Sequence, residues 1–171
     1  IYDGGGESVT NNNIQPGDDH YGIWAHSCED GGGVTITGNT VTGMKGIYVN
    51  SSDSSKISSN TIVASHIGIS AESNTYITIS QNNITGQVQN YGVYVNDGGN
   101  NSSGVGYNGN NSTTNPGDYD VVITNNYIKR TDNNITCCPN SIGIYKWGGT
   151  FGTLIKGNAV IFDDSTATSD D

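Results

Sequence analysis

Hydrophobic and polar positions along the chain follow a short phrase that occurs six times. Each copy has an aliphatic residue, two spacers, an Asn, one more spacer and then Ile or Val, as in Ile57-Ser-Ser-Asn60-Thr-Ile62. Intervals of 21 and 22 residues separate three successive copies. A period in that range is typical of stacked supersecondary units, so the pattern predicts a solenoid. The recurrent Asn stands at Asn12, Asn39, Asn60, Asn82, Asn126 and Asn158.

A second phrase follows most copies and consists of Gly, an aliphatic residue, an outward residue and usually a small aliphatic residue. Gly46-Ile47-Tyr48-Val49 is an example. Side chains alternate between the two faces of a strand, so Ile47 and Val49 are expected inside and Tyr48 outside. The Gly predicts a corner that has a positive φ or lies close to the backbone of a neighbouring coil.

The two phrases together predict an all-β, single-stranded, right-handed parallel β-helix of about six coils. An Asn amide carries both a donor and an acceptor, and Asn tolerates the left-handed conformation at a bend. Stacked copies are therefore expected to form a hydrogen-bonded Asn ladder along the axis. The alternative interpretation is that Asn is used only because it favours turns.

Two polar insertions interrupt the period, at residues 97–118 and 129–141. We expect one β-helix domain over residues 1–171, with both insertions as loops outside a corner. Such loops are often sites of partner binding, and the alternative for the first is a disordered or glycosylated surface loop.

Composition narrows the possible partners and the location. Only 32% of the 171 residues are hydrophobic and 25 are Gly, which suits a slim core. A net charge of -10 argues against nucleic acid and anionic membranes, and it disfavours polyuronate substrates. No apolar run reaches the ~18 residues of a membrane span. A chain that begins at Ile1, without an initiator Met or signal peptide, is expected to be processed or excerpted.

Sequons of the N-x-[ST] type and the polar composition favour an extracellular or cell-surface location. The glycosylation candidates are Asn50, Asn83, Asn100, Asn101, Asn110, Asn111 and Asn134. Cys28, Cys137 and Cys138 are disulfide candidates. About four rungs of ~4.8 Å separate the first from the adjacent pair, whereas a bridge needs Cα atoms within ~7 Å. A folded-back loop, a vicinal bond and an intermolecular bridge all stay open.

The two phrases resemble those of the right-handed parallel β-helix superfamily, over nearly the whole chain. That superfamily contains pectate lyases, polygalacturonases, phage tailspikes and the periplasmic copper-site maturation proteins. Its members include enzymes, adhesins and structural rods, so the resemblance implies the fold and leaves the function to the site.

Gly17-Asp18-Asp19 also resembles the segment in which polygalacturonases hold their acid and base, which implies Asp18, Asp19 and His20 as catalytic residues if the chain is an enzyme. Glycoside hydrolysis needs two carboxyl groups on one bond. The family's Gly-His-Gly segment corresponds to Met44-Lys45-Gly46, and its Arg-Ile-Lys segment has no counterpart here. The alternative is an acidic turn at a corner. No metal or other cofactor is expected, although Asp18, Asp19, Glu29 and Asp30 are a possible calcium site.

The outward position of the Gly phrase shows a more regular pattern than these candidate catalytic and calcium-binding residues. It holds an aromatic residue in four of its copies, Trp24, Tyr48, Tyr94 and Tyr145, and Ser70 between them. These residues predict an aromatic column on one outer face. Such a column stabilises neighbouring strands, and it also offers a surface for sugar rings or for another protein.

Three functional hypotheses follow. The first is an extracellular structural or adhesive β-solenoid, N-glycosylated and self-associating end to end or within a larger filament, and more a structural protein than an enzyme. The second is a fragment of a carbohydrate-active enzyme, a polysaccharide hydrolase, lyase or epimerase. The third is a polysaccharide-binding module that uses the aromatic column.

Overall fold

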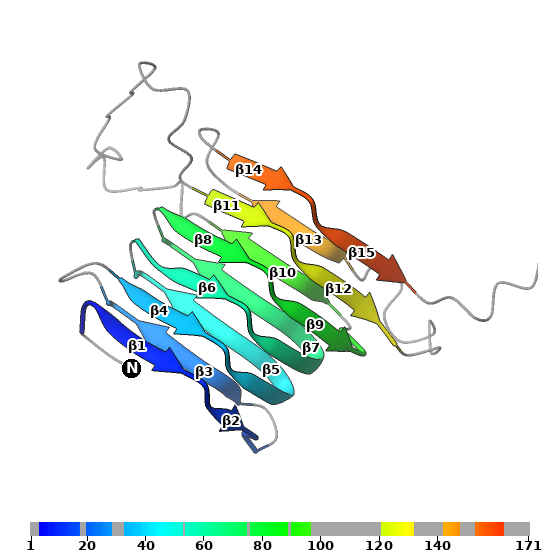
Figure 1. The fold of residues 1–171 in the computed structure, drawn as a ribbon, viewed down its shortest axis with the longest axis horizontal. Coiled ribbons are helices and arrows are strands. Elements are labelled where there is room, and N and C mark those ends of the chain that lie inside the picture. Colours follow the sequence, from blue (N-terminus) through cyan, green and yellow to red (C-terminus); the bar gives the residue numbers. More distant parts are fainter. Residues whose placement is uncertain are drawn as a thin grey trace, which may run out of the picture.

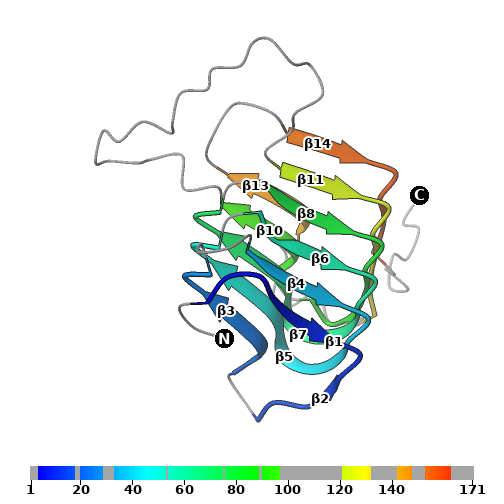
Figure 2. The same cartoon turned by 60° about the vertical axis from the view of Figure 1, so that its left-hand side comes forward.

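The computed structural model describes residues 4–17, 20–28, 33–52, 54–74, 76–88, 90–96, 121–131, 142–147 and 153–162. Every regular element in these ranges is a β-strand, and every strand pairing is parallel. The strands stack side by side along one axis and wrap around a narrow interior (Figure 1 and Figure 2). In the described part of the chain, no helix is long and apolar enough to cross a membrane.

One sheet contains the strands that precede the recurrent Asn. Its order is β1-β4-β6-β8-β11-β14. The strands are β1 (Glu7–Thr10), β4 (Val34–Thr37), β6 (Lys56–Ser58), β8 (Ile77–Ser80), β11 (Val121–Thr124) and β14 (Thr153–Lys156).

The second sheet contains the strands that follow the Asn and is bent into two halves. Strands β5 (Thr40–Asn50) and β7 (Thr61–Glu72) run through both halves. The first half adds β2 (Asn13–Ile14), β9 (Asn83–Gly86), β12 (Tyr127–Arg130) and β15 (Ala159–Phe162). The second half adds β3 (Tyr21–His26), β10 (Tyr91–Asn96) and β13 (Ile142–Trp147). The register between β5 and β7 shifts between Gly43 and Lys45, where the chain turns from one half to the other.

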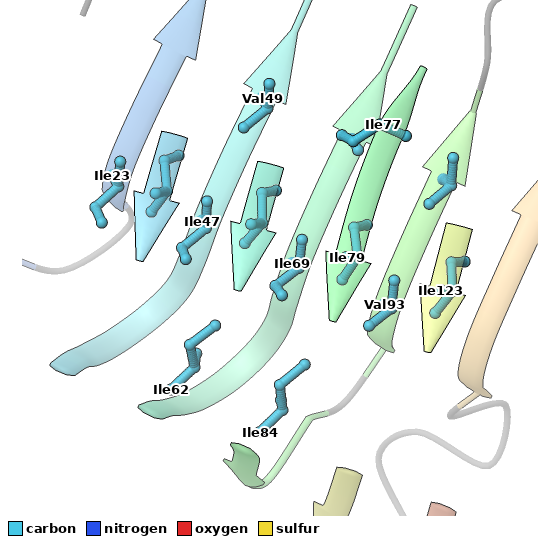
Figure 3. Packing of buried hydrophobic residues seen from close by; sticks show 14 of the residues in the cluster. Ile23, Ile47, Val49, Ile62, Ile69, Ile77, Ile79, Ile84, Val93 and Ile123 are labelled. Atoms are coloured by element: carbon cyan, nitrogen blue, oxygen red, sulfur yellow. The ribbon is translucent and has the colours of Figure 1, made fainter. Parts of the chain in front are cut away.

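The core consists of aliphatic rows that cross the strands in register (Figure 3). Ile36, Ile57, Ile79 and Ile123 form one such row on the first sheet. Ile47, Ile69 and Val93 form another on the second half of the other sheet. Their full burial supplies the hydrophobic stabilisation of each coil, and the interior has room only for alternate side chains of each strand.

The recurrent Asn side chains form a hydrogen-bonded ladder from Asn12 to Asn158. In each step the backbone N–H and Nδ2 of one Asn donate to Oδ1 of the next, at 3.0 Å for both bonds from Asn39 to Asn60. Nδ2 also donates to a backbone oxygen of the preceding coil, as from Asn60 to Ile36 at 3.0 Å. The same donor-to-acceptor order holds at every step, so the ladder has one direction.

Close backbone approach, rather than positive φ, explains the Gly of the second phrase. An added Cβ at Gly46 would lie 2.2 Å from the carbonyl oxygen of Gly68, and one at Gly68 would lie 2.6 Å from that of Gly92. Neither residue is among those with a positive φ. Any side chain here would therefore collide with the next coil.

One expectation changes at the level of single residues. Lys129 and Arg130, which we expected at the start of the second insertion, belong to strand β12. Cys28 is a free thiol in this structure and is fully buried in the aliphatic core, and the disulfide pairing stays a prediction of the sequence. Cys137 and Cys138 lie outside the described residues.

Candidate functional site

The most regular surface feature is a row of aromatic side chains on the outer face of the second half-sheet. Cα pairing places Trp24 against Tyr48, Tyr48 against Ser70, Ser70 against Tyr94, and Tyr94 against Tyr145. The column expected from the sequence is thus a continuous row over strands β3, β5, β7, β10 and β13, whose order Figure 1 shows. We call this surface the aromatic face.

Tyr21 and Tyr91 enlarge the aromatic face into two clusters. The ring of Tyr21 stacks on that of Tyr48 with centroids 4.7 Å apart, and Trp24 lies 6.2 Å from Tyr48. Tyr91 lies 5.0 Å from Tyr94. Tyr145 in turn stacks on Tyr91 and Tyr94, at centroid distances of 5.3 and 5.8 Å. These mutual contacts hold the rings in place.

Sequence reasoning missed Tyr21 and Tyr91 because they stand one position before the Gly of the second phrase. The period of two assigns that position to the inner face. Their ring contacts with Tyr48 and Tyr94 show that the corner at the Gly changes the alternation. In the intervening strands the equivalent position holds Lys45 and Ile67. The dipeptide Tyr-Gly at both places was the available signal.

Between the two clusters lies a polar pair on strand β7. Ser70 occupies the aromatic row and is only 1% exposed. Its hydroxyl donates to Oε1 of Glu72 at 3.1 Å. The carboxylate lies near the phenol of Tyr48, whose pKa is raised first by burial and then by this negative charge. Glu72 is therefore fixed at the junction of the two clusters.

A second outer row runs beside the aromatic row and is mainly polar. Register places Asn50 between His26 and Glu72, and Asn96 follows Glu72. Nδ1 of His26 lies 2.8 Å from Oδ1 of Asn50, and Nδ2 of Asn50 donates to the backbone oxygen of Glu72 at 3.3 Å. Aromatic rings and amide groups thus run in parallel along the stack.

Burial and the charge of Glu72 raise the pKa of three phenols on the aromatic face. Burial, followed by the negative charge of Glu72, raises the pKa of Tyr48 to about 12. The same two causes in the same order raise the pKa of Tyr21 and Tyr94 above 10.0, with Asn96 opposing the shift at Tyr94. Neutral phenols act as hydrogen-bond donors as well as apolar platforms.

Comparison with known proteins identifies the class of protein. The model of the family described as "Periplasmic copper-binding protein (NosD)" matches residues 1–114, and the chain belongs to this family of right-handed β-helix proteins. The expected β-helix fold and a location outside the cytoplasm agree with this family at a coarse level. The match gives no specific support for a polygalacturonase. No curated protein and no solved structure matches the chain.

The described residues do not fit the copper site that the family description implies. Histidine, cysteine and methionine are the usual copper ligands. Cys28 is buried in the core, and His26 lies on the outer face of β3 against Asn50. His66 is in β7 and contacts Asn90. Within the described ranges, no three His, Cys, Asp or Glu side chains gather in one place.

The other candidate residues are mostly not brought together. Asp18, Asp19, Glu29 and Asp30 lie outside the described residues, and His20 is exposed. Among the residues with described positions, the carboxylic side chains are Glu7 on β1 and Glu72 on β7, in different sheets. The catalytic and calcium hypotheses therefore stay predictions.

The sequons divide into different environments. Asn83 is exposed on β9, whereas the amide of Asn50 is held by His26, Ser51 and the backbone of Glu72. The remaining candidates lie outside the described ranges, and these are Asn100, Asn101, Asn110, Asn111 and Asn134.

Proposed function

We propose that this protein is an extracytoplasmic β-solenoid that binds linear polysaccharide chains along its aromatic face, in a structural or adhesive role. The observation that carries the proposal is the in-register row Trp24, Tyr48, Ser70, Tyr94 and Tyr145, with two clusters of stacked rings. Copper binding is not part of this proposal.

The aromatic face has the properties of a binding surface rather than of a packing core. Trp24 is 56% exposed, and the three tyrosines of the row are partly exposed. Tyrosine and tryptophan supply rigid, amphipathic contact area at a low cost in conformational entropy. Because the rings already contact one another, little side-chain freedom remains to be lost when a ligand binds.

The dimensions favour an extended ligand. Neighbouring strands lie ~4.8 Å apart, so the four strand steps from Trp24 to Tyr145 span about 19 Å along the stack. A linear oligosaccharide lying along the axis can place successive sugar faces on the two clusters. The amides of the adjacent row, with His26 and Glu72, are in reach of its hydroxyl groups.

Binding is favoured over hydrolysis by the distribution of acids. A glycosidase needs two carboxyl groups that flank one bond. On the described part of the aromatic face, Glu72 is the carboxylic side chain. End-to-end assembly and N-glycosylation remain predictions of the sequence alone.

Affinity measurements on a panel of neutral hexasaccharides, including cellohexaose and mannohexaose, test the proposal. We expect binding by the wild type and a loss of about tenfold for Tyr48→Ala or Tyr94→Ala, since each variant removes a stacking platform. Tyr127→Ala is the matched control, because Tyr127 is exposed on β12 away from the aromatic face. Absence of binding to the whole panel, or equal affinity for all variants, would reject the proposal.

A further inference from the structure

We infer that Glu72 makes the aromatic face selective for uncharged glycans and excludes polyuronates. The inference rests on the proposed function and adds to it the substrate class and the residue that sets it. Three features of Glu72 lead to it, namely its place in the row, its fixed orientation and the range of its charge.

Glu72 occupies the centre of the candidate binding surface. Register places it between Asn50 and Asn96 in the polar row, on the strand that separates the two aromatic clusters. A glycan that spans both clusters must pass over this strand. Every such ligand therefore meets the carboxylate.

The carboxylate is held in place by a neighbour on its own strand, since the hydroxyl of Ser70 donates to Oε1 at 3.1 Å. It also lies near Tyr48 on the adjacent strand, whose pKa is raised first by burial and then by the charge of Glu72. Such a group can still accept hydrogen bonds from sugar hydroxyls through its remaining lone pairs. Uncharged glycans offer those donors at every residue.

The charge of Glu72 extends over both clusters. Its field acts on Tyr21 and Tyr48 on one side and on Tyr94 on the other. A positive charge lies at the edge of the first cluster, where Nζ of Lys45 is 5.2 Å from the centroid of the Tyr21 ring. The chain as a whole carries a net charge of -10.

A polyuronate would bring one carboxylate per sugar residue against this fixed negative charge. The like charges repel, and a carboxylate that packs on the tyrosines beside Glu72 loses hydration while it faces this negative charge. Uncharged glycans avoid both costs. Specificity then comes from repulsion of the wrong ligand as well as from contacts to the right one.

The test compares cellohexaose and mannohexaose with their counterparts that carry a carboxylate at C6, together with a glucosamine hexamer as a cationic probe. The wild type is expected to bind the neutral member of a pair about tenfold more tightly than the uronate. In Glu72→Gln, which keeps the shape and the acceptor oxygen, the ratio should fall below about threefold through tighter uronate binding. Glu7→Gln is the control, since it removes the same charge from β1 on the other sheet.

Each outcome is informative. A ratio near one in the wild type, or a ratio unchanged by Glu72→Gln, overturns the inference while the proposed function stands. Tightest binding of the glucosamine hexamer also overturns it, because Glu72 would then be selecting cations. Failure of every probe to bind rejects the proposed function together with the inference. Raised salt should reduce the discrimination in the wild type, since a partly exposed charge is screened.

Discussion

Replacing Asn60 by alanine removes the side chain from the middle of the Asn ladder, where it is only 1% exposed. Its Oδ1 accepts from the backbone N–H and Nδ2 of Asn39, both at 3.0 Å. Its Nδ2 donates to Ile36 O at 3.0 Å and to Oδ1 of Asn82 at 2.9 Å. All four hydrogen bonds disappear in Asn60→Ala.

The size of the loss in free energy of unfolding follows from the polar groups that Asn60→Ala leaves without a partner. The buried N–H of Asn39 loses its acceptor, which costs about 1–3 kcal/mol, and the other three bonds contribute about 0.5–1.5 kcal/mol each, with overlap. We expect the free energy of unfolding to fall by about 3–5 kcal/mol, a large share of the ~5–15 kcal/mol typical of a domain.

Urea denaturation followed by circular dichroism measures this change. Asn83→Ala is the matched control, because Asn83 is the exposed residue that follows Asn82 in the same phrase, and it should change stability by less than about 0.5 kcal/mol. The reasoning about the ladder is refuted if Asn60→Ala costs less than about 1 kcal/mol or no more than the control.

Two further predictions concern the corners and the aromatic face. Gly68→Ala should destabilise the fold by about 1–3 kcal/mol, because its Cβ would lie 2.5 Å from Cγ2 of Ile84 and 2.6 Å from the oxygen of Gly92. Thermal melting of Gly17→Ala, where a Cβ meets nothing within 4 Å, gives the control; equal melting temperatures would contradict the close-approach argument. Stability should also fall as the pH rises from 10.0 towards about 12, since the raised pKa of Tyr48 favours its protonated form in the folded state and deprotonation favours unfolding. Tyr48→Phe should lessen this loss of stability at alkaline pH in denaturation measurements. An unchanged dependence of stability on pH would argue against assigning the loss to Tyr48.

The regular part of the architecture could be predicted because each repeat in the sequence corresponds to one coil of the stack. Constant spacing between Asn60 and its flanking isoleucines defines the bend and both strand registers. The outward position of Tyr48 then follows from the two-residue alternation. No long-range pairing has to be guessed, since each coil pairs with its neighbours in the stack.

The missed features depend on corners, where alternation changes. A second polar seam runs through the corner after the second half-sheet. The backbone N–H of Cys28 donates to Oγ of Ser52 at 3.1 Å, and that of Ser52 donates to Oδ1 of Asn74 at 2.8 Å. Cys28, Ser52 and Asn74 occupy equivalent positions in this seam. Because they are three different residue types, no repeated residue in the sequence marks the seam. The core position of Cys28 was missed for the same reason.

Glu72 shows how a residue with a proposed role in ligand selection escapes a search for sequence motifs. It stands two positions after Ser70, at the place held by Asn50 and Asn96 in neighbouring strands. Period-two alternation predicts that it faces outward, but its importance comes from neighbours that are 22 to 24 residues away in sequence. Only the register shows that its charge lies between two tyrosine clusters.

The uniform direction of the Asn ladder makes the chain modular in whole repeats. Every Asn between the two ends of the ladder receives hydrogen bonds from one neighbour and gives them to the other, so any coil that carries the same phrase can replace another without reversing a bond. Removal of residues 61–82 would bring Asn126 directly against Asn60 with donors and acceptors matched. Removal of one residue would shift the phrase and break both seams. For protein engineering, the interchangeable part is therefore the repeat of 21 or 22 residues, and the length of the aromatic face can be adjusted in steps of one strand.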